Sequence, residues 1–123
     1  MKKLLLVLFA TICLSNVFAQ QDKNIELAKL LLTSFQKNDF EKIYTAFDTN
    51  MKSALSKEKL KLIWADLTAV EKCGDFQKSG DATTEKIKEY DVVYIPCTFK
   101  NTVLKMKTVF NKQNNISGLF FVP

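Results

Sequence analysis

The stretch DVVYIPCTFKNTVLKMKTVF, residues 91–110, decides the fold because its apolar side chains recur at every second residue. In its first half one side carries Val93, Ile95, Cys97 and Phe99, and in its second half one side carries Leu104, Met106, Thr108 and Phe110. Lys105 and Lys107 fall on the opposite side. This alternation is typical of strands that bury one face. The stretch therefore predicts two strands that contribute one side each to the core.

The segments on either side of this stretch extend the predicted sheet. Residues 83–88 form a plausible polar strand, residues 111–115 are rich in turn formers, and residues 116–122 form a closing strand. Phe120 and Phe121 are adjacent, so a strand must direct them to opposite faces. We expect one to be buried against helices and the other to be exposed or covered by a partner subunit. This pattern is our basis for expecting a possible homodimer through the sheet face.

The first half of the chain has a helical period instead. Apolar residues recur at helical spacing in three runs, with Ile25, Ala28, Leu31, Leu32 and Phe35 in the first, Phe40, Ile43, Tyr44 and Phe47 in the second, and Leu60, Ile63, Trp64 and Leu67 in the third. Asp39 and Ser56 are suitable N-caps, and residues 48–55 suit a turn or one short helix. We expect the third helix to end near Lys72, with Gly74 as its terminator. Helices followed by strands predict an α+β domain with helices on one face of an antiparallel sheet.

The first 19 residues have the pattern of a secretory signal peptide. Met1-Lys2-Lys3 precedes an apolar run over residues 4–14, and Val17-Phe18-Ala19 forms a small-residue cleavage site. The run is too short to span a bilayer as a helix. We therefore expect a signal peptide over 1–19, a short segment over 20–24 and one domain over 25–123. The protein would be exported to the periplasm or the medium, without stable membrane insertion after processing.

Composition excludes several functions. The chain has 123 residues, no histidine and a formal charge of +5, and every basic residue is a lysine. Without histidine, a Ser-His-Asp mechanism is excluded and metal binding is disfavoured. Without arginine, and with acidic residues interspersed among the lysines, nucleic-acid binding is disfavoured. We expect no cofactor, no metal and no nucleic-acid partner.

The order of several signatures resembles the bacterial domain-of-unknown-function family 3887 (DUF3887). They are Asn38-Asp39-Phe40, Phe47-Asp48, Met51, Leu55-Ser56, Trp64, Leu67, Gly74, Phe76, Val92-Val93 and the ending over residues 116–123. The resemblance covers residues 25–123. It implies three helices cupped against a curved sheet, similar to the NTF2-like or SnoaL-like cone. The family's activity is not established, so the resemblance transfers no catalytic residue.

Cys73 and Cys97 are the cysteines left after the predicted processing. An even pair in an exported protein suggests a disulfide that ties the third helix to the sheet. The alternative is two separate buried thiols that act as small core residues. No Cys-x-x-Cys motif is present, and two thiols without histidine do not make a zinc site.

Two kinds of function remain. The first is a non-enzymatic exported domain that binds a small apolar ligand or a protein partner, with ligand-pocket candidates Tyr44, Phe47, Trp64, Tyr94, Phe99 and Phe110. A filled core beside an apolar outer sheet face would favour the protein partner. The alternative is a SnoaL-like or isomerase-type enzyme that moves protons with an aspartate or tyrosine in the cone cavity. Its candidates are Asp39, Asp48, Asp66, Tyr44 and Tyr94, and because no catalytic residue is assigned, the expectation leans against an enzyme.

Overall fold

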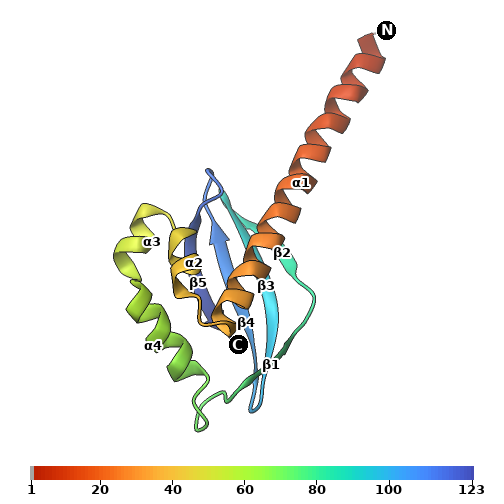
Figure 1. Cartoon of the computed structure of the whole chain (residues 1–123). Coiled ribbons are helices and arrows are strands. Elements are labelled where there is room, and N and C mark those ends of the chain that lie inside the picture. Colours follow the sequence, from red (N-terminus) through yellow and green to blue (C-terminus); the bar gives the residue numbers. More distant parts are fainter. Residues whose placement is uncertain (1) are drawn as a thin grey trace.

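The computed structural model describes the backbone of residues 2–123 and the side chains of residues 19–123. The described chain forms an α+β fold, as expected. Its elements are α1 (Lys2–Gln36), α2 (Phe40–Thr45), α3 (Thr49–Ala54), α4 (Lys57–Leu67), β1 (Phe76–Ser79), β2 (Thr83–Ile87), β3 (Tyr90–Phe99), β4 (Val103–Phe110) and β5 (Ile116–Val122). Figure 1 shows these elements, with the N-terminal half of α1 projecting beyond the sheet.

All strand pairs in the sheet are antiparallel. The order is β1-β3-β4-β5, and β2 pairs with β3 as well. Ile95, Met106 and Phe121 are neighbours across three strands, and so are Tyr94, Lys107 and Phe120. The first row faces the helices and the second faces away from them. The prediction that Phe120 and Phe121 lie on opposite faces is confirmed.

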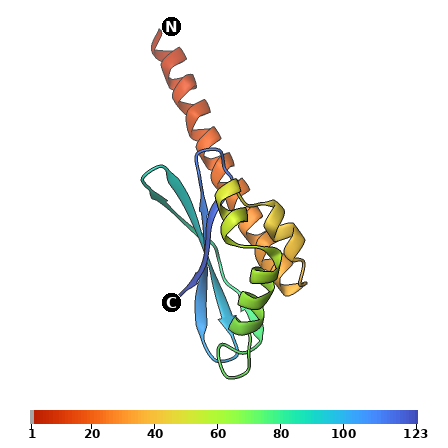
Figure 2. The same cartoon turned by 90° about the vertical axis from the view of Figure 1, so that its left-hand side faces the viewer.

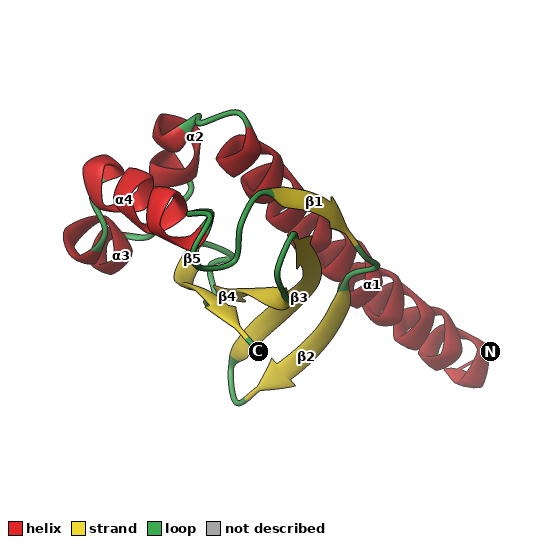
Figure 3. Ribbon diagram, turned by 90° about the horizontal axis from the view of Figure 1, so that it is seen from below, coloured by secondary structure: helices red, strands yellow, loops and turns green. Residues whose placement is uncertain are grey.

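The helices cover one face of the sheet, as Figures 2 and 3 show. The buried side chains of this layer come from both halves of the sequence, including Leu31 and Phe35 of α1, Ile43 of α2 and Trp64 of α4. The alternating residues of β3 and β4 meet them from the sheet, and only Leu104 of the eight is partly buried instead of buried. The predicted inward faces of both strands are therefore confirmed.

Side-chain caps start these helices, at Asp39 and Ser56 as the sequence indicated and also at Asp48. The carboxylates of Asp39 and Asp48 accept hydrogen bonds from the backbone N–H groups of Lys42 (3.3 Å) and Met51 (2.8 Å). Ser56 caps α4 by accepting a bond from the N–H of Lys59 at 3.2 Å. Residues 48–55, for which a turn or one helix remained open, contain helix α3.

The third predicted helix ends earlier than expected. Helix α4 stops at Leu67, not near Lys72, because the chain folds back on its last carbonyl groups. The N–H of Ala69 bonds to the Asp66 carbonyl at 3.3 Å, and the N–H of Cys73 bonds to the Leu67 carbonyl at 3.2 Å. Gly74 follows with a φ of +75°, and a Cβ there would lie 2.9 Å from the Cβ of Lys100. Glycine is thus needed at this turn, although it does not end the helix itself.

The predicted boundary after Ala19 falls inside α1, which continues without a break from Lys2 to Gln36. Among the residues that the structure describes, no helix combines the length and the apolar character needed to cross a membrane. The signal peptide, the domain boundaries and the cone-like shape stay predictions.

Candidate functional site

Four of the six predicted pocket residues form part of the filled core. Phe47, Trp64, Phe99 and Phe110 are all buried. The Trp64 ring lies at centroid distances of 5.1 Å from Phe35, 6.1 Å from Phe99 and 6.0 Å from Phe121. These rings occupy the space between sheet and helices that a ligand cavity would need. One edge of Trp64 also borders an open groove beside α4.

The two predicted tyrosines lie apart from this cluster. Tyr44 is half-buried, with the ammonium groups of Lys52 and Lys57 at 5.7 and 5.8 Å from its ring centroid. Tyr94 is on the outer face, where its hydroxyl donates to a Glu85 carboxylate oxygen at 2.9 Å. That hydrogen bond, with a smaller contribution from burial, raises the pKa of Tyr94. The structure therefore does not gather the six candidates around one cavity.

The aspartates proposed as proton carriers cap helices or form a surface ion pair instead. Asp39 and Asp48 cap helices, and Asp48 also accepts from the Asn111 amide at 3.3 Å. Asp66 pairs with Lys72 at 2.6 Å on the surface. Among residues 19–123, no aspartate or glutamate is buried. The isomerase-type alternative requires a carboxylate in an apolar interior, and the described side chains do not supply one.

The structure contains Cys73 and Cys97 as free thiols, so the Cys73–Cys97 disulfide expected from the sequence is not present. Cys97 points into the core from β3, and its thiol donates to the Ile95 carbonyl at 3.3 Å. Burial raises the pKa of the Cys97 thiol to about 11. Cys73 is half-buried in the turn after α4, where its carbonyl accepts from the Asn101 N–H at 2.9 Å. The alternative of two separate core thiols describes this arrangement, because each side chain already packs against the core.

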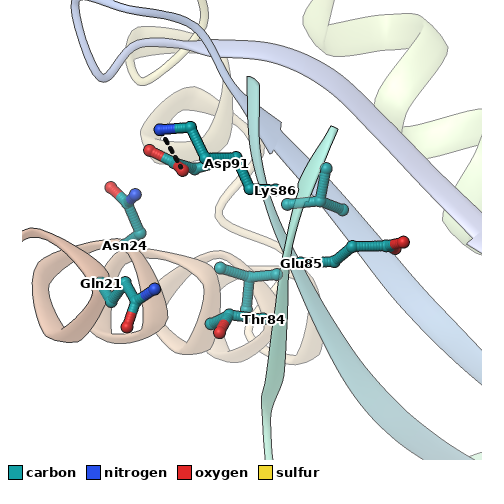
Figure 4. A pocket seen from close by; sticks show the side chains of 8 residues that line it. Gln21, Asn24, Thr84, Glu85, Lys86 and Asp91 are labelled. Atoms are coloured by element: carbon teal, nitrogen blue, oxygen red, sulfur yellow. Dashed lines mark ion pairs between the residues drawn. The ribbon is translucent and has the colours of Figure 1, made fainter. Parts of the chain in front are cut away.

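A polar pocket that sequence reasoning missed lies between residues 21–24 of α1 and the β2–β3 hairpin (Figure 4). Its volume is about 80 Å³, and it is lined by Gln21, Asn24, Thr84, Glu85, Lys86, Asp91, Val92 and Val93. Asn24 is only 3% exposed although its side chain is polar. Asn24 precedes Ala28 by four residues and Leu31 by seven, which places it on the buried stripe of α1. This spacing is the sequence pattern that could have identified Asn24 as a buried polar residue.

The outer face of the sheet carries an exposed aromatic side chain. Phe120 is 53% exposed, and the ammonium group of Lys107 lies 6.0 Å from its ring centroid. The ring covers Gly118, where an added Cβ would lie 3.0 Å from it and 3.2 Å from Val109. Beside the ring is an open groove of about 430 Å³, lined by Asp48, Asn50, Tyr90, Val109, Asn111, Ser117, Gly118 and Phe120. Phe120 thus lines a groove whose other residues are both polar and apolar.

The described residues contain no group of three or more histidine, cysteine, aspartate or glutamate side chains that could hold a metal ion. The geometry offers two other features instead. One is the small polar pocket at Asn24, and the other is the outer face around Phe120.

Comparison with known proteins identifies the family. The family described as "Protein of unknown function (DUF3887)" matches residues 28–119, about three quarters of the chain. This range holds α2 to β4 entirely, with residues 28–36 of α1 and residues 116–119 of β5. Searches of curated proteins and of solved structures each found no significant match. The chain belongs to the DUF3887 family, as the order of its sequence signatures indicated.

Proposed function

We propose that the protein is an exported, non-catalytic binding domain that acts through the outer face of its sheet, and that its partner is a second copy of the same chain. Export is supported by the signal-peptide pattern of residues 1–19. The observation that carries the binding proposal is Phe120, a large aromatic side chain exposed on the outer face beside an uncovered strand edge.

The filled core favours a protein partner over a small apolar ligand. Pockets for small molecules usually enclose roughly 300–1,000 Å³ and are largely apolar. Here the aromatic rings around Trp64 occupy the interior, and the pocket at Asn24 is small and polar. Apolar side chains that a partner could contact lie on the outer face of the sheet. Val103 is 56% exposed there, on the same face as Phe120.

Strand β5 offers a second element of the same surface. It is the last strand in the sheet order. Its first residue bonds to the chain outside the sheet: the Ile116 N–H donates to the Ala46 carbonyl at 3.4 Å, and the Ile116 carbonyl accepts from the Asp48 N–H at 2.9 Å. An uncovered edge presents free backbone N–H and C=O groups to another strand. Proteins commonly protect such edges with charged side chains, but residues 116–122 contain none.

The absence of charge in β5 is the argument for a second copy as partner. Antiparallel pairing of two β5 strands about a two-fold axis would bring like segments together, which charged residues would oppose. With the sheet continued in this way, Phe120 of each copy would lie on the same outer face. The two rings and their lysine neighbours would then form one continuous surface.

The test is the mass of the protein in solution, measured by light scattering during gel filtration over a range of concentrations. The wild type is expected to be a dimer and Phe120→Lys a monomer with an unchanged circular dichroism spectrum. Leu62→Lys is the matched control, because Leu62 is an apolar residue that is 68% exposed on α4, far along the chain from β5. A monomeric wild type, or equal dissociation by both variants, would contradict the proposal.

Export is tested separately. The protein would be recovered from the envelope or medium of its producing cells and its N-terminus sequenced. A mature chain that starts at Gln20 is the expected result. A chain that retains Met1 or remains inside the cells would remove the export part of the proposal and leave the binding part intact.

A further inference from the structure

The pocket at Asn24 contains a buried hydrogen-bond donor that has no acceptor. The side-chain oxygen of Asn24 accepts from the Gln20 amide at 3.3 Å, but its Nδ2 has no partner. A buried polar group without a partner is unfavourable, so its presence needs an explanation, and an acceptor from outside the chain would supply one. Nδ2 belongs to a side chain that lines the pocket, as Figure 4 shows.

The opposite wall of the pocket carries one positive and one negative charge. Lys86 of β2 and Asp91 of β3 are cross-strand partners, with 3.7 Å between the ammonium nitrogen and a carboxylate oxygen. This distance is longer than a hydrogen bond, so both groups keep hydrogen-bonding capacity for another molecule. The acidic group of Glu85 is directed elsewhere, since it accepts from Tyr94 on the outer face.

The charges and the volume of the pocket restrict the kind of ligand that it can bind. A net charge on the ligand would meet one unfavourable neighbour, because Lys86 and Asp91 balance each other. A volume of about 80 Å³ admits only a few non-hydrogen atoms beyond the size of a water molecule. A small molecule that carries both charges satisfies the lysine, the aspartate and the Asn24 amide together.

We propose that this pocket binds a compact zwitterion of the amino-acid class, with glycine as the simplest example. The ligand carboxylate accepts from Asn24 Nδ2 and lies towards Lys86, and the ligand ammonium group donates to Asp91. The pocket is on the helix-facing side of the sheet, where Thr84 pairs with the inward-facing Val93. The proposal is therefore independent of the outer-face surface around Phe120.

The test follows the side-chain amide signal of Asn24 in a nitrogen–proton NMR spectrum of the labelled protein, prepared in the processed form that its producing cell leaves. Glycine is expected to shift this signal in a saturable way. Acetate and methylammonium, which each carry half of the ligand's charge pattern, are expected to produce no saturable shift at the same concentration. No response to glycine, or an equal response to acetate, would overturn the proposal.

Charge variants make the selectivity itself measurable. Asp91→Asn leaves the lysine uncompensated, so acetate should now bind and glycine should bind about tenfold more weakly. Lys86→Met should remove glycine binding and introduce binding of methylammonium. Lys112→Met is the matched control, because Lys112 forms a comparable surface pair with Glu89 at 3.0 Å. Unchanged preferences in the Lys86 and Asp91 variants would refute the assigned roles.

Discussion

The rings of Phe35 and Trp64 stack at a centroid distance of 5.1 Å and an interplanar angle of 28°, which joins α1 to α4 through the centre of the core. Phe35 also meets Phe121 of β5 at 5.7 Å, so one side chain contacts both the helix layer and the sheet. Its ring also meets Phe40 of α2 at 6.3 Å. This arrangement makes Phe35 the natural position at which to measure the strength of the core.

Replacing Phe35 with alanine should lower the free energy of unfolding by about 3–5 kcal/mol, since it removes a buried ring and leaves a cavity. Denaturant unfolding followed by the fluorescence of Trp64, the single tryptophan, measures this directly. Leu62→Ala on the exposed side of α4 should change the same free energy by only about 0.5 kcal/mol or less. Similar losses from the two variants would mean that the Phe35–Trp64 contact is not central to stability.

Thr108→Val should stabilise the protein by about 1 kcal/mol. The Thr108 hydroxyl is fully buried on the inward face of β4 and has no hydrogen-bond partner, so a methyl group of similar size removes an unfavourable burial. Ser34→Ala provides the contrast, because the Ser34 hydroxyl is also buried but donates to the Leu30 carbonyl at 2.8 Å. No comparable gain is expected there. A loss of stability in Thr108→Val would show that the hydroxyl has a partner in solution.

Cys97 should resist alkylation in the native protein. With its pKa raised from 9.0 to about 11 by burial, the thiolate fraction near pH 8 falls about a hundredfold, and the core also blocks the reagent. Peptide mapping after treatment with iodoacetamide should show modification of Cys97 only when the protein is unfolded first. If Cys97 stays unmodified in unfolded protein until a reductant is added, a disulfide is present after all.

The same shift has a consequence for stability at high pH. Because the folded-state pKa of Cys97 lies above the unfolded value, the native state holds its proton where the unfolded state releases it. The resulting contribution to stability is complete below pH 9 and declines as the pH rises towards about 11. Cys97→Ala should remove this part of the decline. An identical pH profile for variant and wild type between these limits would contradict the assignment.

Tyr94 should ionise at a higher pH than an ordinary tyrosine. Its hydroxyl donates to Glu85, and ionisation would break that bond and place two negative groups together. In Glu85→Gln the titration midpoint of Tyr94, read from the phenolate absorbance against a Tyr94→Phe reference, should fall towards the usual value. A midpoint that does not respond to the Glu85 substitution would place the cause elsewhere.

The strands were more predictable than the sites. Alternating residues determined the inward faces of β3 and β4, and cap residues such as Asp39 and Ser56 marked helix starts. Strand β1 was missed because its four residues contain a single apolar side chain, Phe76, and too few positions to show a period. The end of α4 was misplaced because it depends on a fold-back to Leu67 that no local spacing encodes.

The aromatic residues show why site prediction is harder than fold prediction. Composition identifies Trp64 and Phe99 as interior residues, but the same pattern would suit a filled core or a lined cavity. Only packing decides between them, and here the rings contact one another. Asn24 shows a different problem, since the pocket that it lines is completed by strands more than fifty residues away in the sequence.

The connectivity of the sheet has a consequence for the order in which the molecule assembles. Strands β2, β3 and β4 each pair with the next strand along the chain, and these nearby pairings are the kind that form quickly. Helix α1 is synthesised first, but the strands that bury Leu31 and Phe35 are synthesised last. Its docking must therefore be a late event that waits for the sheet. Until then the apolar stripe of α1 that holds Leu31 and Phe35 has no partner surface, so these side chains stay in contact with water during that interval.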